Sequence, residues 1–250
     1  LDIPLNIQKE DIDPDTLFGY EKSNSNECYD ENYIDRKIDL LVDDLRSSKR
    51  PIMLIGGGVR ISKAVDEVRE LINQLCIPAC PSWNALDVVT SDMEYYGGRV
   101  GTYGGDGRNF AIQNCDLLLC IGCRISGRIT GGNLETFARG AKKYVVDVDE
   151  TLVEPYLQQV AIDENILSDA KYFINRLLLK TRNTQYDYNW WTKRVFEWRD
   201  KYDPVAPDFY KESDFTHPYV FMRKLSERMN SNGILVGDCG GNIVISNHAF

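Results

Sequence analysis

A repeated order of apolar run, glycine-rich turn and amphipathic helix constrains the fold of this chain more than any other feature. In the first unit, the apolar run 51–55 (PIMLI) leads into Gly56-Gly57-Gly58, and apolar residues at helical spacing follow within 61–75. A short run that is apolar at every position is typical of a parallel strand buried on both faces. The pattern therefore predicts a doubly wound α/β fold, with a mainly parallel six-stranded sheet and helices on both faces.

The same order returns along the chain and defines the other expected elements. Ser62 and Ser168 stand at the start of two expected helices and are predicted to be their N-caps. Further core strands are expected at 77–82, 115–122 and 143–149, and core helices at 33–50, 108–114, 134–141 and 168–180. Outside this core, we expect strands at 1–8 and 233–238 and helices at 189–202 and 217–230.

Changes in composition divide the chain into segments, which we place at 1–32, 33–180, 181–215 and 216–250. The third segment is aromatic and polar, and a mobile linker would not carry its tryptophans. We expect these side chains, Trp190, Trp191 and Trp198, to pack against another domain or subunit. Because the sequence begins without Met, at what reads as a strand already under way, we interpret it as a piece of a longer protein.

The net charge and the amino-acid composition exclude several classes of function. The net charge is −9, and no cluster of Lys and Arg is present that could grip nucleic acid without regard to sequence. No apolar stretch approaches the roughly 20 residues of a membrane span. We therefore expect neither a nucleic-acid nor a membrane partner. The seven cysteines are an odd number and lie mostly in apolar runs, which favours a reducing, cytoplasmic location over a disulfide framework.

The stretch CIGCRISGRITGG, residues 120–132, combines a pair of cysteines with two arginines. Cys120 and Cys123 have the spacing of a redox or zinc pair. However, no second Cys or His pair stands at zinc spacing, and this pair closes a strand instead of opening a helix. We therefore interpret both cysteines as buried core thiols, and we expect Arg124 and Arg128 to hold an anion.

Three kinds of residue follow successive strands at the carboxyl edge of the expected sheet, where open α/β sheets bind ligands. The glycines 56–58 would let a ligand approach the backbone, and the helix behind them would favour a phosphate. The arginines would bind phosphate oxygens, and the carboxylates in 147–149 could accept hydrogen bonds from ribose hydroxyls. Together they indicate a nucleotide site, although a tight turn and a solvated strand end are simpler explanations of the glycines and the carboxylates taken alone. A nicotinamide site is less favoured, because GGGVRI lacks the last glycine of the G-x-G-x-x-G motif.

The ordered strand ends resemble a known family. The stretches PIMLIGGGVRISKA, VGTYGGDGRNFAIQNCDLLLCIGCRISGRITG, FARGAKKYVVDVDE and DENILSDAKYF together resemble the central domain of thiamine-diphosphate enzymes of the acetolactate synthase type. LDIPLNIQ is similar to the closing strand of the family's first, pyrimidine-binding domain. GILVGDCGGN is similar to the opening strand and turn of its third, pyrophosphate-binding domain. The resemblance implies a Rossmann-like central domain in the second segment, with edges of the two flanking domains in the first and last.

The resemblance also implies a cofactor for the central domain, which in this family often holds FAD. The implied contacts are Gly57, Gly58, Ser82, Trp83, Gly101, Thr102, Tyr103, Gly122, Arg124, Ser126, Arg128, Asp147, Val148 and Asp169. The family usually has His where Tyr103 stands and a pair of Asp where Ser126-Gly127 stand. ADP or an empty site therefore remain open beside FAD.

The resemblance further implies the function of the whole protein. It is expected to be a carboligase or decarboxylase that uses thiamine diphosphate and Mg²⁺ on a 2-keto acid such as pyruvate, as a homodimer or homotetramer. Gly240, Gly241 and Asn242 would contact thiamine diphosphate. The activating glutamate and the Mg²⁺ ligands lie elsewhere in the family, so we expect no catalytic or metal residue here and no turnover by this chain alone. Because GGN replaces the family's Gly-Gln-His-Gln, acyl transfer to a keto-sugar stays open, as does a non-catalytic nucleotide-binding module.

Overall fold

The computed structural model describes residues 3–19, 30–149, 160–211, 214–230 and 232–250. Its centre is a parallel sheet with the strand order β2-β1-β3-β4-β5. The strands are β1 (Pro51–Ile55), β2 (Ala79–Pro81), β3 (Leu117–Ile121), β4 (Lys142–Asp147) and β5 (Glu164–Leu167). The doubly wound α/β fold is thus confirmed, with five strands within the described residues where six were expected.

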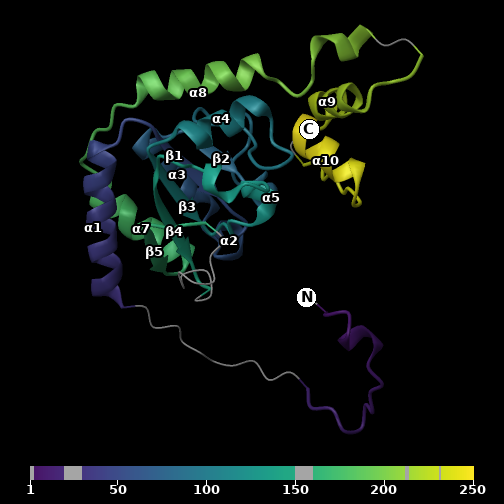
Figure 1. The fold of residues 1–250 in the computed structure, drawn as a ribbon, viewed down its shortest axis with the longest axis horizontal. Helices are drawn as coiled ribbons and strands as arrows, with labels where there is room; N and C mark the ends of the chain where they lie inside the picture. The colour runs from purple at the N-terminus through teal and green to yellow at the C-terminus, as the bar shows by residue number, and fades with distance from the viewer. Residues whose placement is uncertain (1–2, 20–29, 150–159, 212–213, 231) are drawn as a thin grey trace.

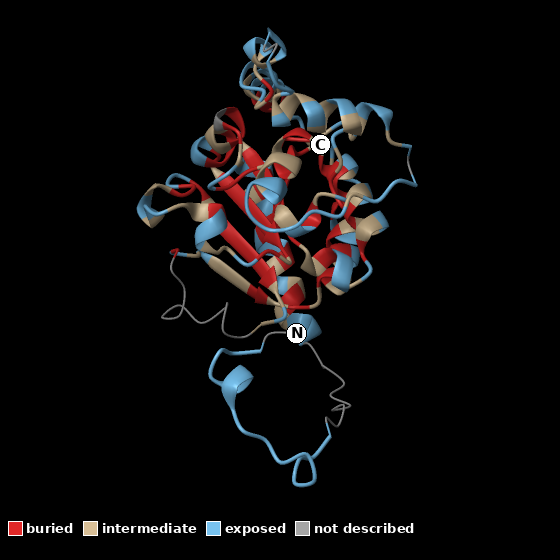
Figure 2. Cartoon of the chain, turned by 90° about the vertical axis from the view of Figure 1, so that its right-hand side faces the viewer, coloured by how far each residue is buried: buried red, intermediate tan, exposed pale blue. Residues whose placement is uncertain are grey.

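Helices cover both faces of the sheet (Figure 1). On one face lie α1 (Glu31–Ser47), α3 (Val65–Leu75) and α7 (Ala170–Thr181), whose apolar sides join one buried cluster with the strands. On the other face lie α4 (Asp106–Asn114) and α8 (Asn189–Lys201), which share a second cluster. β1, β2 and β3 are buried at every position between these two layers, which explains why β1 and β3 are apolar throughout, whereas β4 and β5 begin with polar residues (Figure 2).

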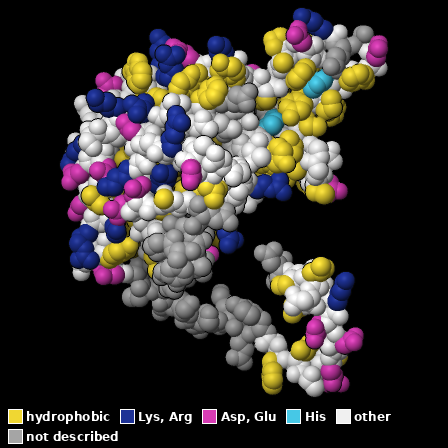
Figure 3. Space-filling model, in the orientation of Figure 1, with side chains coloured by type: hydrophobic (Ala, Val, Ile, Leu, Met, Phe, Trp, Pro, Cys, Tyr) yellow, Lys and Arg dark blue, Asp and Glu magenta, His cyan; other side chains and the backbone are white. Residues whose placement is uncertain are grey.

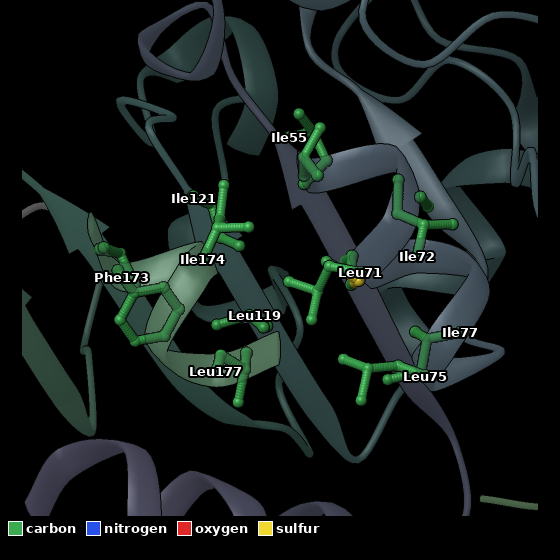
Figure 4. Packing of buried hydrophobic residues seen from close by; sticks show 14 of the residues in the cluster. Ile55, Leu71, Ile72, Leu75, Ile77, Leu119, Ile121, Phe173, Ile174 and Leu177 are labelled. Carbon is green, nitrogen blue, oxygen red and sulfur yellow. The ribbon is translucent and has the colours of Figure 1, made fainter. Parts of the chain in front are cut away.

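The core between the sheet and α3 and α7 is closely packed (Figure 4). Leu71 and Leu75 of α3 and Leu177 of α7 face the strand residues Leu119 and Ile121. All five side chains are fully buried. Burial of one such aliphatic side chain stabilises a fold by about 1.5–3 kcal/mol, so this layer fixes the two helices against the strands.

Two predicted N-caps are wrong, and in both cases a neighbouring residue begins the helix. Ser62 ends the short helix α2 (Gly58–Ile61), where its N–H donates to the carbonyl of Gly58 at 2.9 Å; α3 then starts after Ala64. Ser168 is buried, and the carboxylate of Asp169 caps α7 by accepting from the N–H of Tyr172 at 3.0 Å. A carboxylate next to a serine is an equally good cap, so the sequence does not decide between them.

Three predicted elements do not form in the described chain. The helix expected at 134–141 is only a 3₁₀ turn (Leu134–Thr136), because Ala138 adopts a left-handed φ of 45° that a helix does not allow. Of the strand expected at 1–8, residues 3–8 hold no strand but the start of a 3₁₀ turn (Ile7–Lys9), and residues 1–2 lie outside the described residues. Residues 233–238 are irregular as well. Neither segment lies beside a strand with which it could pair, and a strand needs such a partner.

The aromatic segment after α7 packs against the sheet layer of the same chain. Trp191 on α8 is buried, and its indole N–H donates to the carbonyl of Pro51 at 2.9 Å. Its ring meets that of Trp198 edge to face, with centroids 5.8 Å apart, whereas Trp190 stays 65% exposed. Two of the three tryptophans thus pack within this chain, and the expected packing against another domain or subunit stays a prediction.

The last described part of the chain forms a pair of helices beside this layer (Figure 1). A 3₁₀ helix η5 (Pro207–Lys211) precedes α9 (Pro218–Arg228), and α10 (Gly241–Ala249) packs against α9. No helix in the part of the chain that the structure describes is both long enough and apolar enough to cross a bilayer.

Candidate functional site

The strand order places a binding crevice at the carboxyl ends of β1 and β3. The chain passes from β1 to β2 on one side and then returns to place β3 on the other side of β1, with Ile55 paired to Ile121. Such a reversal opens a crevice, because the connections that leave the two strands run in opposite directions. The turns at this point are Gly56-Gly57-Gly58 and Gly122, so the crevice lies between the two glycine turns.

The glycines bring the two turns into backbone contact. The N–H of Gly58 donates to the carbonyl of Gly122 at 3.0 Å, and Gly122 has a left-handed φ of 57°. A Cβ at Gly58 would lie 2.8 Å from the Cα of Gly122, and one at Gly122 would lie 2.9 Å from the Cα of Gly58. The helix that follows these glycines, α2, is a single turn, and its first N–H is already bound to Gly122. The expected phosphate at this helix start stays a prediction.

A cavity of about 920 Å³ opens above these turns, and we call it the switch-point cavity. The predicted residues that line it are Gly57, Gly58, Ser82, Trp83, Tyr103, Gly122, Arg124, Ser126, Arg128, Gly240 and Gly241. They come from five parts of the chain: the turn after β1, the turn after β3, the 3₁₀ helix η2 (Trp83–Ala85) after β2, the loop before α4, and the start of α10. The structure therefore brings most of the predicted contacts into one site.

Arginine and aromatic side chains lie together in the lining of this cavity. The guanidinium of Arg128 lies 5.7 Å from the ring centre of Trp83 and 5.9 Å from that of Tyr103. The two rings are 5.6 Å apart. Neither Arg128 nor Arg124 forms a salt bridge with any described residue. The indole N–H of Trp83 is buried and has no partner in the described structure. The cavity thus offers cationic donors beside flat rings, which suits an anion that carries an aromatic group.

A second cavity of about 340 Å³ continues the first toward β4 and β5. The two cavities share Gly58, Ile61, Gly122 and Arg124 as lining residues. The second also contains the predicted contacts Asp147, Val148 and Asp169. Together the two cavities form one elongated site along the carboxyl edge of the sheet.

The carboxylate of Asp147 is the acidic group at the end of β4. Burial raises its pKa, and hydrogen bonds from the N–H groups of Asp149 and Val148 oppose that rise. The group is therefore partly desolvated, and it lines the second cavity. A carboxylate in this position can accept hydrogen bonds from sugar hydroxyls.

Three predicted contacts do not line either cavity. The N–H of Thr102 donates to the carbonyl of Arg128 at 2.8 Å, and Gly101 forms two hydrogen bonds of 3.0 Å with the side chain of Asn109. These bonds support the segment that carries Arg128, and both residues line a third, smaller cavity of about 120 Å³. Their contact with a ligand stays a prediction. Asn242 is exposed on α10 and lies outside both linings.

Other residues of the switch-point cavity were not predicted. They are Ile61, Asn84, Cys123, Ile129, Cys239, Ile243 and Val244. Asn84 follows Ser82 by two positions after β2, and inspection of that strand end could have found it. Ile243 and Val244 lie on α10, and no sequence pattern signals that this helix reaches the site.

The two cysteines of the 120–132 stretch are core thiols, as predicted. Cys120 is fully buried and Cys123 is 2% exposed. Burial raises the pKa of both thiols, that of Cys123 to about 12. Thiols with such pKa values do not ionise near neutral pH, so neither suits redox chemistry. Within the described ranges, no group of three or more His, Cys, Asp or Glu side chains could hold a metal ion.

Comparison with known proteins adds an independent finding. The sequence model of the family described as "Thiamine pyrophosphate enzyme, central domain" matches residues 38–177. The chain is 32% identical to a probable acetolactate synthase large subunit of Methanocaldococcus jannaschii, over 82% of this chain and 35% of the relative. It is 30% identical to the large subunit of acetolactate synthase isozyme 2 of Escherichia coli K12, over 78% of this chain and 34% of the relative.

A further relative is matched along the whole chain. It is a probable acetolactate synthase large subunit of Methanococcus aeolicus, 27% identical over 100% of this chain and 43% of the relative. The chain thus spans between about a third and about two fifths of the length of these curated relatives.

Proposed function

The chain belongs to the thiamine pyrophosphate enzymes, whose central domain it contains, and on that premise we propose that the whole protein is a carboligase of the acetolactate synthase type. It acts with thiamine diphosphate and Mg²⁺ on a 2-keto acid such as pyruvate. The names of the relatives support this reaction class. When bound, thiamine diphosphate supplies the electron sink that decarboxylation and carbon–carbon bond formation require.

Within the whole protein, the role of this chain is to bind an adenine-type nucleotide, FAD or ADP. The observation that carries this proposal is the pair of arginines without salt bridges, Arg124 and Arg128, over glycine turns at the strand-order reversal. An arginine without a salt bridge in a concave site can bind phosphate oxygens in a bidentate manner. The charge of Arg124 also acts on Asp147, where it opposes the rise in pKa that burial causes.

The described residues fit such a nucleotide at several points. Arg124 lines both cavities and would bind the phosphate groups between them. Asp147 in the second cavity would accept from ribose hydroxyls. Trp83 and Tyr103, whose rings are 5.6 Å apart in the cavity wall, would lie against a flat ring.

Titration of the intact protein with FAD and with ADP tests this role. We expect Arg124→Gln and Arg128→Gln each to weaken binding by about tenfold to a hundredfold, the effect of losing a hydrogen bond to a charged group. Arg182→Gln is the matched control, because Arg182 is an exposed arginine at the end of α7, outside both cavities. Equal affinity in all four proteins would remove the nucleotide role.

One observation favours a second reaction. The start of α10 reads Gly240-Gly241-Asn242 where the resemblance leads us to expect Gly-Gln-His-Gln. The smaller residues would leave more room near thiamine diphosphate, which suits a bulkier acceptor such as a keto-sugar. The test incubates the intact protein with pyruvate, thiamine diphosphate and Mg²⁺, with and without a keto-sugar. Acetolactate without the sugar supports the first reaction, and an acetylated branched sugar supports the second.

We also propose that the intact protein is a homodimer or homotetramer in the cytoplasm, without a nucleic-acid partner. Support comes from the family assignment and from the net charge of −9. Light scattering coupled to size-exclusion chromatography measures the mass of the assembly directly, and a monomer at working concentration would contradict the proposal.

A further inference from the structure

The loop from Gly97 to Gly105 encloses the side chain of Arg108. A Cβ at Gly98, whose φ is 96°, or at Gly105 would collide with atoms of this arginine. Arg108 is only 7% exposed, and its Nε has no hydrogen-bond partner in the described structure. The arginine therefore supports the loop from within, and the loop places Tyr103 in the wall of the switch-point cavity.

Arg99 lies on the same loop and extends to the far end of α10. Its guanidinium donates to the carbonyl of Ser246 at 3.3 Å, to that of Asn247, and to that of Phe250 at 2.5 Å. A guanidinium that donates to backbone carbonyls forms charge-assisted hydrogen bonds, which are stronger than neutral ones. The loop is thus joined to α10 by three charge-assisted hydrogen bonds.

A second arginine holds the same helix end from α9. The Nε of Arg223 donates to the carbonyl of Ala249 at 3.1 Å, and its guanidinium is bound by the carboxylate of Asp203 at 2.9 Å. Burial lowers the pKa of Arg99, which shows that its guanidinium has lost much of its hydration. Its bonds to α10 compensate for that loss, since a desolvated charge is unfavourable unless its donors are bound.

The opposite end of α10 closes the switch-point cavity. The residues at this end that line the cavity are Cys239, Gly240, Gly241, Ile243 and Val244. A helix of nine residues is about 13 Å long and behaves as one rigid body, so a hold on its last turn sets the position of its first. One loop therefore carries a wall residue of the cavity, Tyr103, and also the anchor of the opposite wall, Arg99.

We propose that Arg99 is a positioning residue that couples ligand binding in the switch-point cavity to the docking of α10. The inference rests on the proposed function, because it takes the ligand to be FAD or ADP. A ligand between Tyr103 and the start of α10 is held more tightly when α10 is docked. By thermodynamic reciprocity, the bound ligand holds α10 in place to the same extent.

The experiment measures hydrogen–deuterium exchange in peptides that cover 239–249 of the intact protein, free and with ADP or FAD, together with the dissociation constants. In the wild type, ADP slows exchange in these peptides. In Arg99→Gln, exchange there is faster even without ligand, and ADP binds about tenfold more weakly, because the loss of charge-assisted bonds leaves α10 undocked. Arg99→Lys, which keeps the charge and one donor group, restores part of the affinity.

Arg50→Gln is the matched control. The Nε of Arg50 also donates to a helix-end carbonyl, that of Asn114 at 2.7 Å, but it precedes β1 and lies at the opposite edge of the sheet. This variant leaves ADP affinity and exchange in 239–249 unchanged. Wild-type affinity and wild-type exchange in Arg99→Gln overturn the coupling and leave the nucleotide role standing. A wild type that binds neither FAD nor ADP overturns both.

Discussion

At the scale of single residues, the site depends on glycines whose side-chain atoms the structure cannot accommodate. Gly122 combines a φ of 57° with backbone contact to the turn after β1. Its function is therefore to let two turns pack, and the packed turns then form the floor of the cavity. The glycines that suggested a phosphate loop in the sequence are needed even if no ligand is bound.

Gly122→Ala is expected to lower the free energy of unfolding by about 2–4 kcal/mol. The left-handed conformation costs an alanine about 1–2 kcal/mol, and a Cβ 2.9 Å from the Cα of Gly58 forces the turns apart. Gly127→Ala is the control, because nothing lies within 4 Å of the Cβ position there. Urea unfolding of both variants measures the difference, and similar midpoints would show that the turns are not in close contact.

His248 on α10 predicts a pH dependence of stability. Burial lowers its pKa from the ordinary 6.5, and the nearby charges of Arg108 and Arg99 lower it further; its Nδ1 lies 2.9 Å from the hydroxyl of Tyr219. Because the unfolded chain takes up this proton more readily, the contribution of His248 is fully present above pH 6.5. It declines as the pH falls from 6.5 toward the lowered pKa.

Thermal unfolding between pH 7.5 and pH 5.5, in wild type and His248→Gln, measures this contribution. The wild type is expected to lose more stability than the variant over the range, because glutamine can accept from Tyr219 but takes up no proton. Parallel pH profiles of the two proteins would mean that His248 does not face the arginines.

At the scale of secondary-structure elements, burial on one helix face decides which residues stabilise the fold. Leu177 on α7 is fully buried against β3, whereas Leu179 on the same helix is 65% exposed. Leu177→Ala should therefore lower the free energy of unfolding by about 2–5 kcal/mol, and Leu179→Ala by less than about 1 kcal/mol. Chemical denaturation compares the two, and equal losses would contradict the placement of α7.

The elements that the sequence predicted well are those with long periodic patterns. The fully apolar strands β1 and β3, and the helix α1 with its apolar stripe, need only local spacing to be recognised. The failures occur where a partner far along the chain decides the outcome. Residues 233–238 read as a strand, yet Ile234 and Val236 stay 85% and 88% exposed because no neighbouring strand pairs with them in the described chain.

The residues of the site could likewise be predicted where a local pattern decides their position, and not where a distant partner does. Strand-end residues such as Arg124 and Asp147 could be predicted, because a parallel sheet brings all its carboxyl ends to one edge. The hydrogen bonds of Gly101 and Thr102 to Asn109 and Gly127 could not be predicted, because the sequence does not show which distant residues meet. Ile243 and Val244 of α10 were missed in the cavity wall for the same reason.

At the scale of the whole molecule, the crevice is lined by the sheet layer and by the start of α10, and α10 packs against α9. Hydrophobic side chains remain exposed on and around α9 and α10, among them Phe215, Phe221 and Ile243 (Figure 3). The site itself is assembled from both parts: the sheet layer supplies the glycine floor and the arginines, and α10 supplies a wall.

The central claim is that this crevice holds an adenine-type nucleotide, and the small molecule that the protein carries when purified tests it most directly. The intact protein is purified, denatured, and the released ligand identified by mass spectrometry, after an absorbance spectrum near about 450 nm, where a bound oxidised flavin absorbs. We predict one FAD or ADP for each chain in the wild type and much less in the double variant Arg124→Gln/Arg128→Gln. A wild type that carries out its reaction, releases no nucleotide and binds none when FAD or ADP is added would contradict the account.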